Sequence, residues 1–498
     1  MRERITFVQK EGDSIEPTAL KVDGNGLRGP EVKAVREDRL TFALDELPAE
    51  LKTLLEGVNQ LHIRWVGPVA YEAVSPLLAR LPPGFHLFYT PGSDTSTNPC
   101  PLLNKAFGTN SCSSPSESFT TLPTDRFTHS TAHQFYQPLP SLSAFTNFAK
   151  SQLCPAGSST QSFCESRLSS LNKASQLDIS YDTISHTLRL TSLGPYGSQS
   201  LSASLLSPSI RTEVGIISTA SPKTLEPHEV GISGLLTVLG QQTAPSPILF
   251  SFPSRHRDAA SSFTSRFLSP TGLHPTLQLS ISSPTPPKAS PNPETCRLHG
   301  YFTLPKTIFP DRYQLDDELF LASKNLIKVR YVTPGVDLEA PEYVMTTWGS
   351  AMLVELAPPS QGGEGKGEWT AEVPLHLRYL APSVTGYRTA EVPYPALFWA
   401  CTAEEGTKFP TNPFEKDKVG YDGLFGERTV FWHLSPKPEQ GDNRLVNTIK
   451  VPVLNLERAD WVTVGTAAVV LLGFAWVVVK LLLVVFGGNT VDKEKKKQ

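Results

Sequence analysis

Short runs in which apolar and polar residues alternate recur along most of the chain, and they predict β-strands. Leu61–Val66 reads "LHIRWV" and Phe85–Thr90 reads "FHLFYT", while Leu177–Leu193 has two alternating arms around a short turn, as a hairpin does. Pro48–Gln60 is expected to form a helix, and Glu372–Leu380 alternates like the earlier strands. Strands at short intervals with turns between them predict a mainly β protein, built of antiparallel, sandwich-like modules with loop-rich insertions.

Stretches rich in proline, serine and threonine interrupt this pattern and suggest where the chain divides. The predicted organisation follows the chain from end to end. It comprises an N-terminal β-rich region at 1–90, Ser/Pro-rich and partly disordered loops at 91–170, a β-rich region at 171–282 that completes the N-terminal half, a Pro-rich linker at 283–295, a second β domain at 296–456, a transmembrane helix at 461–486 and a basic cytosolic tail at 487–498.

The segment Trp461–Phe486 is apolar except for small or hydroxyl residues and Lys480. As a helix it is roughly 39 Å long, enough to cross a hydrocarbon core of about 30 Å with some tilt. A buried core helix is the alternative, but soluble helices of this length normally carry a polar face. Gly465, Ala468 and Gly473 are small residues that would let a second helix approach closely in lipid.

Lysines are concentrated after the span, which favours a cytosolic C-terminus and places the large N-terminal part on the other side of the membrane. Lys495 and Lys496 resemble the di-lysine retrieval signal of endoplasmic reticulum membrane proteins, although a solvated basic tail is the simpler interpretation. The opening residues lack the apolar core of a signal peptide. A tail-anchored protein whose bulk faces the cytosol therefore stays open as an alternative.

The six cysteines fit disulfides formed in an oxidising compartment, because none has the Cys-x-x-Cys spacing of zinc or redox sites. Pairing of Cys100 with Cys112 and of Cys154 with Cys164 is one of the connectivities that six cysteines allow, and spacing does not choose among them. Cys296 and Cys401 bracket the second module, so a bridge between them would close a long loop. The alternative is a pair of buried free thiols.

Composition and motifs argue against chemistry and against nucleic acid. Net charge is −3, and the basic residues are scattered, so no basic stripe is available for nucleic acid. His228 and Glu229 begin a zinc-protease-like motif, but Ile232 stands where the second histidine is needed. The sequence has no G-x-S-x-G elbow, P-loop or Asp-x-Asp triplet. We therefore expect no catalytic residue, no metal and no cofactor.

A few polar residues of the second module still need to be weighed as a hidden catalytic group. His299 and His376 are expected on strands, where a histidine on a sheet face is the ordinary interpretation. Asp311, Asp316 and Asp317 lie around predicted turns, where acids commonly cap or stay solvated.

Two stretches resemble a known family. Cys296–Leu315 reads "CRLHGYFTLPKTIFPDRYQL", and Val373–Cys401 reads "VPLHLRYLAPSVTGYRTAEVPYPALFWAC". Their order, their spacing and the single span that follows resemble the PIG-X family, so the region 296–456 is interpreted as a PIG-X-like luminal domain. The opening "MRERITFVQK" and the long N-terminal half resemble the fungal branch, the protease B nonderepressible form proteins.

This resemblance implies a noncatalytic subunit of glycosylphosphatidylinositol (GPI) mannosyltransferase I. The subunit stabilises a polytopic catalytic subunit of the PIG-M type, which adds the first mannose from dolichol-phosphate-mannose. The resemblance also implies a single-pass protein of the endoplasmic reticulum membrane, with its large part in the lumen and no cleaved signal. The fungal branch adds chaperone-like support of luminal proteins such as vacuolar protease B.

Other function classes stay open beside the assembly subunit. A general luminal chaperone or processing factor would act on client proteins rather than on one partner. A cytosolic tail-anchored adaptor would carry its bulk on the opposite side of the membrane.

Overall fold

The structure is a computed structural model of the full chain. It describes residues 1–487 except 93–96, 110, 123–131, 155–160, 206, 208–209, 222–224, 360–367, 411 and 415–419. Strands dominate, which confirms the prediction of a mainly β protein with one apolar C-terminal helix. Two compact units are present: residues 1–378 with 391–448, and residues 379–390 with 449–498.

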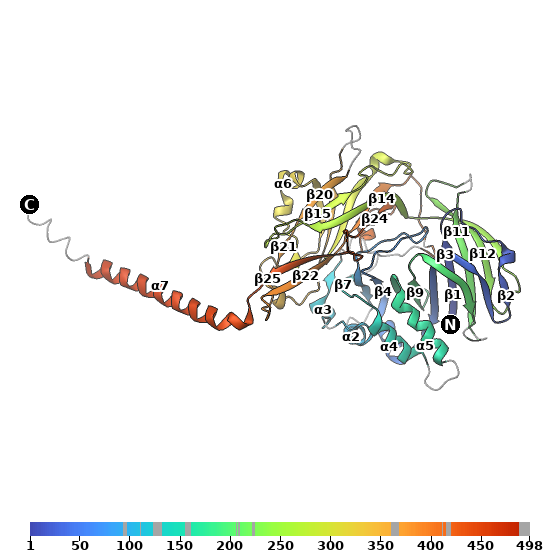
Figure 1. Ribbon diagram of the computed structural model, residues 1–498, viewed down its shortest axis with the longest axis horizontal. Coiled ribbons are helices and arrows are strands. Elements are labelled where there is room, and N and C mark those ends of the chain that lie inside the picture. The colour runs from blue at the N-terminus through green and yellow to red at the C-terminus, as the bar shows by residue number, and fades with distance from the viewer. Residues whose placement is uncertain are drawn as a thin grey trace, which may run out of the picture. The chain divides into compact units, whose positions relative to one another are not determined.

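The first sheet of the larger unit gathers strands from the N-terminal half (Figure 1). In spatial order its strands are β13 (Ser246–Pro253), β12 (Glu229–Val238), β11 (Arg211–Ala220), β1 (Arg2–Gln9), β3 (Gly26–Ala43), β9 (Thr187–Leu193), β8 (Gln176–Asp182), β4 (Val58–Val66), β5 (Gly84–Pro91), β7 (His133–Gln137) and β6 (Thr120–Thr121), with β10 (Gly197–Ser204) and β2 (Lys21–Asp23) also paired to β3. The hairpin predicted at 177–193 is confirmed as β8 and β9. The pair β1–β11 is parallel, so the sheet is not wholly antiparallel as expected.

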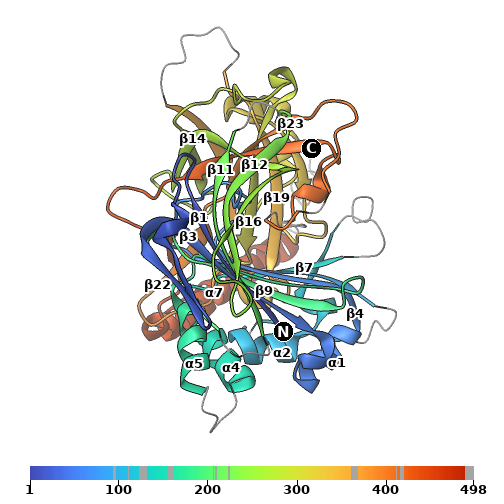
Figure 2. The same ribbon diagram turned by 90° about the vertical axis from the view of Figure 1, so that its right-hand side faces the viewer.

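Helices cover one side of this sheet, and all but the first of them lie within the region that was expected to consist of loops (Figure 2). They are α1 (Ala49–Glu56), α2 (Cys100–Phe107), α3 (Pro115–Ser118), α4 (Ser143–Leu153) and α5 (Gln161–Ser169). The first is the predicted helix, ended early because β4 begins at Val58. The aromatic rings of Phe107 and Phe145 stack 4.6 Å apart and join the core of the sheet. This packing, rather than helix propensity, explains why a Ser/Pro-rich stretch becomes helical.

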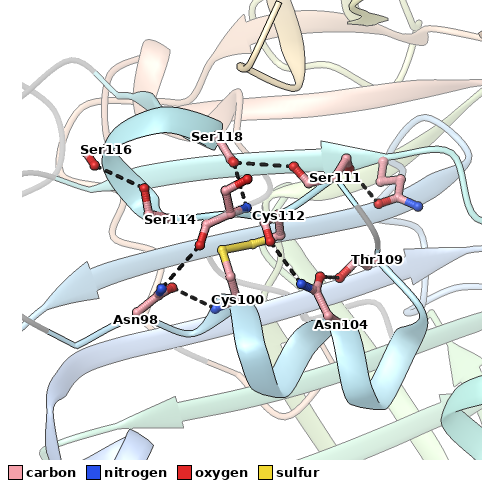
Figure 3. The surroundings of a disulfide bond; sticks show 11 residues. Asn98, Cys100, Asn104, Thr109, Ser111, Cys112, Ser114, Ser116 and Ser118 are labelled. Atoms are coloured by element: carbon pink, nitrogen blue, oxygen red, sulfur yellow. Dashed lines mark hydrogen bonds between the residues drawn. A yellow bond between two sulfur atoms is a disulfide. The ribbon is translucent and has the colours of Figure 1, made fainter.

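Two local disulfides brace the same region. Cys154 pairs with Cys164, and Cys100 at the start of α2 pairs with Cys112. Around the latter, Asn104 Nδ2 donates to the backbone oxygen of Cys112 at 2.9 Å, and Thr109 Oγ1 donates to Asn104 Oδ1 at 2.8 Å (Figure 3). The turn after α2 is therefore closed by both a covalent bond and side-chain hydrogen bonds.

The second sheet combines strands from both sides of the expected linker. In spatial order its strands are β18 (Leu326–Val332), β19 (Gly349–Leu356), β16 (Arg297–Pro305), β23 (Ala396–Thr402), β24 (Thr429–Pro436), β14 (His256–Phe267), β15 (Thr276–Ile281) and β20 (Trp369–Pro374). Both β14 and β15 precede residue 283, yet they lie between β24 and β20 (Figure 1). The segment 283–295 thus connects two strands of one sheet and does not separate two domains, in contrast to the sequence-based division.

A single hydrophobic core joins the two sheets. It includes Phe85 and Phe135 from the first sheet together with Phe398 and Phe431 from the second. Buried hydrogen bonds cross the same boundary. Gln134 Nε2 of β7 donates to Tyr301 Oη of β16 at 3.2 Å, and Trp348 Nε1 donates to the backbone oxygen of Gln134 at 3.0 Å. We call this boundary the aromatic seam; its members also include Tyr136 and Tyr421, whose hydroxyls donate to backbone oxygens of Pro83 and Arg80.

The remaining elements are short or belong to the smaller unit. They are β17 (Ile308–Phe309) paired with β21 (His376–Leu377), β22 (Tyr387–Pro393) paired with β25 (Val446–Pro452), α6 (Glu318–Ser323) and the C-terminal helix α7 (Ala459–Gly487). Asp317 begins α6 as its N-cap, accepting hydrogen bonds from the backbone N–H groups of Leu319 and Phe320. This is the turn-capping role expected of an acid in that stretch.

The third disulfide generates a prediction about stability. Cys296 and Cys401 are 105 residues apart in sequence, whereas Cys100 and Cys112 are 12 apart. Loop-closure entropy then predicts that removing the long-range bridge lowers the free energy of unfolding by about 4.7 kcal/mol, and the short-range bridge by about 3 kcal/mol. Chemical denaturation of the detergent-solubilised double variants Cys296→Ser/Cys401→Ser and Cys100→Ser/Cys112→Ser measures the difference. An equal or smaller loss for the long-range pair contradicts the prediction.

Candidate functional site

The second sheet contains the two stretches that carry the family resemblance, and a disulfide joins them. Cys296 precedes β16, and Cys401 lies on the neighbouring strand β23. The strands are in antiparallel register, with Arg297 opposite Ala400, so the bridge closes the end of an already paired ladder. Both cysteines are buried, and all six cysteines of the chain are in disulfides. A cysteine nucleophile or thiolate metal ligand is therefore not offered by the oxidised chain.

His299 lies three residues beyond Cys296, buried on β16. Its Nδ1 donates to the backbone oxygen of Arg297 at 2.9 Å, and its ring packs edge-to-face against Phe425, with centroids 5.0 Å apart. Burial, followed by repulsion from Arg330, lowers the pKa of His299 to about 4. The imidazole is consequently neutral near pH 7 and serves as a packed core group.

The acid nearest to His299 forms ion pairs with arginines of the two neighbouring strands. Glu355 of β19 lies 3.9 Å from His299 Nε2 and accepts a hydrogen bond from Arg330 Nε of β18 at 2.7 Å. Arg297 of β16 is 4.0 Å from the other carboxylate oxygen. This buried carboxylate thus connects three adjacent strands. Charge-assisted hydrogen bonds of this kind are strong when shielded from water.

A surface cavity of about 540 Å³ opens beside this network. It is lined by Arg297, His299 and Arg330, by the disulfide-bonded Cys401 and by the turn around Phe425. A catalytic constellation needs a nucleophile or water held against a base of suitable pKa. Here the histidine is buried and neutral and the carboxylate is paired, so the geometry supports a structural role for the cavity wall.

His376 is the second histidine singled out by the sequence, and the structure brings it next to Asp311. His376 Nε2 lies 3.9 Å from Asp311 Oδ2 and 3.1 Å from Gln314 Oε1, while its Nδ1 is 3.1 Å from His274 Nδ1. Partial burial and the neighbouring His274 both lower the pKa of His376. Asp311 Oδ1 accepts a backbone hydrogen bond from Tyr313 at 2.9 Å, so this acid also shapes a turn.

His299 lies on β16 of the second sheet, and His376 lies on the two-stranded β17–β21 sheet. The residues weighed as a hidden catalytic group therefore do not form one constellation: Asp311 and His376 come together, and His299 does not join them.

A second histidine pair, which is buried, was not predicted from the sequence. His256 of β14 and His433 of β24 stack, with ring centroids 5.1 Å apart and a 2.8 Å hydrogen bond between Nδ1 of His256 and Nε2 of His433. Burial lowers the pKa of His256 to about 3 and that of His433 well below its ordinary value. The residues meet because β14 and β24 pair in parallel, across a separation in sequence that no local pattern reveals.

Within the described part of the chain, no group of three or more His, Cys, Asp or Glu side chains is arranged to hold a metal ion. The zinc-like motif at His228 precedes the strand β12 rather than lying on a helix. A cavity of about 100 Å³ between the first sheet and helices α1, α2 and α4 is lined almost entirely by apolar side chains, among them Phe42, Leu103 and Phe148. It lacks the convergent polar groups by which a binding site fixes a ligand.

One helix among the described residues is long and apolar enough to cross a membrane. It runs over Leu456–Phe486, 31 residues with a mean hydropathy of 2.8, and none of its most apolar window is buried. Gly465 and Gly473 have no atom within contact distance of an added side chain, so small-residue surface is available on this helix. With three disulfides, this helix fits a single-pass membrane protein whose bulk is luminal. Lys495 and Lys496 lie outside the described residues.

Comparisons with known proteins agree with these features. A family model described as PIG-X / PBN1 matches residues 270–482, and so begins before the expected linker and includes β15. Protein pbn1 of Neurospora crassa is 59% identical over 484 residues, covering 97% of this chain and 95% of that protein. Protein PBN1 of Gibberella zeae is 46% identical over 505 residues, 100% and 99% of the two chains.

A third relative is Protein pbn1 of Emericella nidulans, which is 42% identical over 513 residues and covers 97% of this chain and 96% of that protein. The similarity thus extends across both sheets and the C-terminal helix. This chain belongs to the PIG-X / PBN1 family, in its fungal branch.

Proposed function

We propose that this chain is a noncatalytic, stabilising subunit of GPI mannosyltransferase I, the complex that adds the first mannose in GPI-anchor biosynthesis. The proposal rests on one observation: the residues of the two family-defining stretches that could take part in chemistry have structural roles instead. Cys296 and Cys401 are bonded to each other, His299 is buried, and Asp311 shapes a turn. Family membership supplies the pathway, and this arrangement supports a scaffold rather than an enzyme.

The proposed location is the endoplasmic reticulum membrane, with both sheets in the lumen and the lysine-rich tail in the cytosol. Three disulfides support an oxidising compartment for the bulk of the chain. The alternative of a cytosolic adaptor would expose these disulfides to a reducing environment. Lys495 and Lys496 would act as the retrieval signal that keeps the protein in this membrane.

The proposed partner is the polytopic catalytic subunit of the PIG-M type. The helix α7 would pack beside the partner's spans through the small residues Gly465, Ala468 and Gly473. The luminal sheets would cover a loop or edge of the partner. A subunit that binds only the folded partner raises the partner's apparent stability by mass action, without taking part in chemistry.

A protein-binding role has support on the surface of the first sheet as well. The strand β13 ends the strand order and exposes Leu249 and Phe250, with 71% and 39% of their surfaces accessible. Natural sheets usually protect such edges with charges or bulges, because an open apolar edge pairs readily with other chains. This edge is the feature through which chaperone-like support of luminal proteins such as vacuolar protease B would operate.

The first prediction concerns the abundance of the partner. Deleting this chain should lower the steady-state level of the catalytic subunit, because the unbound subunit loses the stabilisation that binding gives. Quantitative immunoblotting of the tagged catalytic subunit, with its messenger RNA level as a control, measures the effect. Unchanged abundance together with lost mannosylation would argue for a direct part in catalysis.

A second prediction separates scaffold from enzyme. The variants His376→Ala, Asp311→Ala and His299→Gln should leave mannose transfer per molecule of catalytic subunit unchanged, because none of these side chains contacts the reaction. The measurement is transfer of labelled mannose to GPI precursor in microsomes, normalised to catalytic subunit. His299→Gln is preferred to alanine because it avoids a cavity in the core. An enzyme would instead lose activity while its abundance and its partner binding persist.

The buried histidines generate a third prediction, on pH. Burial lowers the pKa of His256 to about 3 and of His299 to about 4, whereas the unfolded chain binds these protons near pH 6.5. The unfolded state therefore binds more protons below that pH, and stability should fall on acidification by up to about 1.4 kcal/mol per pH unit for each histidine.

Urea unfolding of the detergent-solubilised chain between pH 7.5 and pH 5 measures this dependence. The double variant His256→Asn/His433→Asn should give a flatter dependence than the native chain, because two of the titrating groups are gone. An unchanged slope in that variant would show that these two histidines do not contribute.

A further inference from the structure

The smaller unit joins two segments, far apart in sequence, directly before the apolar helix. Residues 379–390 form one segment, and residues 449–456, the part of the unit that leads into the helix, form the other. Ser383 N donates to the backbone oxygen of Leu454, and Leu456 N donates to the backbone oxygen of Ser383, each at 3.1 Å. Val453 N donates to the oxygen of Gly386 at 2.9 Å. The turn at 383–387 is therefore held to the residues that lead into the helix. We call these two segments the juxtamembrane unit.

The juxtamembrane unit exposes large apolar and aromatic side chains. Between 43% and 67% of the surface of each is accessible; they are Tyr379, Val384, Tyr387, Leu454 and Leu456. Exposed apolar groups gathered on so short a unit favour an interaction surface. Two of them are tyrosines, whose ring and hydroxyl suit the boundary between hydrocarbon and water.

Basic groups stand beside these side chains. Lys450 Nζ lies over the Tyr387 ring, 4.4 Å from its centroid, and Arg388 donates to the backbone oxygen of Pro382 at 3.1 Å. Aromatic rings with adjacent cations are well suited to a layer of lipid phosphates. The acid nearest to Lys450 in sequence is Glu457, and the acid nearest to Arg388 is Glu391, which is paired with Arg444 at 3.3 Å.

The length of the helix sets the depth of this unit. Thirty-one helical residues from Leu456 to Phe486 extend roughly 46 Å, close to the ~40–45 Å thickness of a bilayer that includes its headgroups. With the tilt of about 20° that is usual for such helices, this length spans about 44 Å and places Leu456 in the headgroup layer. Because Ser383 is hydrogen-bonded to the backbone of Leu456, the turn at 383–387 lies at the same depth.

We propose that the juxtamembrane unit is a membrane-interface anchor, with Val384, Leu454 and Leu456 inserted into the headgroup region of the bilayer that α7 spans. The occupant of this apolar surface is lipid, because the surface is continuous with the span. Tyr379 and Tyr387 lie at the water boundary, and Lys450 and Arg388 face lipid phosphates. The anchor does not depend on the catalytic partner or on the proposed complex.

The test uses the full-length chain, reconstituted alone into phosphatidylcholine vesicles that contain a fraction of anionic lipid. All six native cysteines are in disulfides, so a cysteine introduced at Val384 is labelled selectively with an environment-sensitive fluorophore. Ile184, exposed by 90% in the turn between β8 and β9, is the matched control position in the other unit. Leu454→Cys provides a second position in the anchor.

Labels at positions 384 and 454 should show blue-shifted emission and strong quenching by lipids that carry a nitroxide in the headgroup region. The label at position 184 should keep the emission of an aqueous probe. Aqueous emission at both 384 and 454 overturns the proposal. Labels that become shielded only when the polytopic mannosyltransferase is added also overturn it, because the surface would then bind protein rather than lipid.

Discussion

The aromatic seam between the two sheets is the constraint on which the rest of the larger unit depends. Gln134 of the first sheet is hydrogen-bonded to Tyr301 and Trp348 of the second sheet and its connections, and the Tyr136 ring packs edge-to-face against Trp348. A buried polar group without its partner costs about 1–3 kcal/mol, so neither sheet can separate without exposing both aromatic surface and unpaired groups. The two halves of the chain therefore act as one folded body.

The same packing engages the histidine, glutamate and cysteine side chains that could otherwise take part in chemistry. Glu355 connects three strands through Arg330 and Arg297. His256 and His433 stack on each other from two neighbouring parallel strands, and Cys296 is bonded to Cys401. Each group satisfies a requirement of folding, and burial lowers the pKa of both histidines so that they pack as neutral rings. Side chains used in this way suit the proposed role of holding another chain in its folded state.

Much of the strand content could be predicted, because alternation of apolar and polar residues is local. The hairpin at β8 and β9 and the strands β4 and β5 follow directly from it. The helices α2 and α4 could not be predicted, since their apolar residues become a face only against the sheet. The linker at 283–295 has the composition of a domain boundary. The non-local pairing of β14 with β24 shows instead that the linker connects strands of one sheet. The same non-local pairing creates the histidine pair.

A stabilising subunit with one span gains from being held in the membrane. When two proteins are confined to the same bilayer, the effective concentration of each near the other is higher than it would be in solution. Weak contacts then keep a substantial fraction of the two proteins bound to each other. Stabilisation grows with the logarithm of the ratio of this effective concentration to the dissociation constant, so a concentration of 100 times that constant would stabilise the proposed partner by about 2.7 kcal/mol. Ordering the residues next to the span reduces the conformational freedom lost on association, and affinity rises without any new contact.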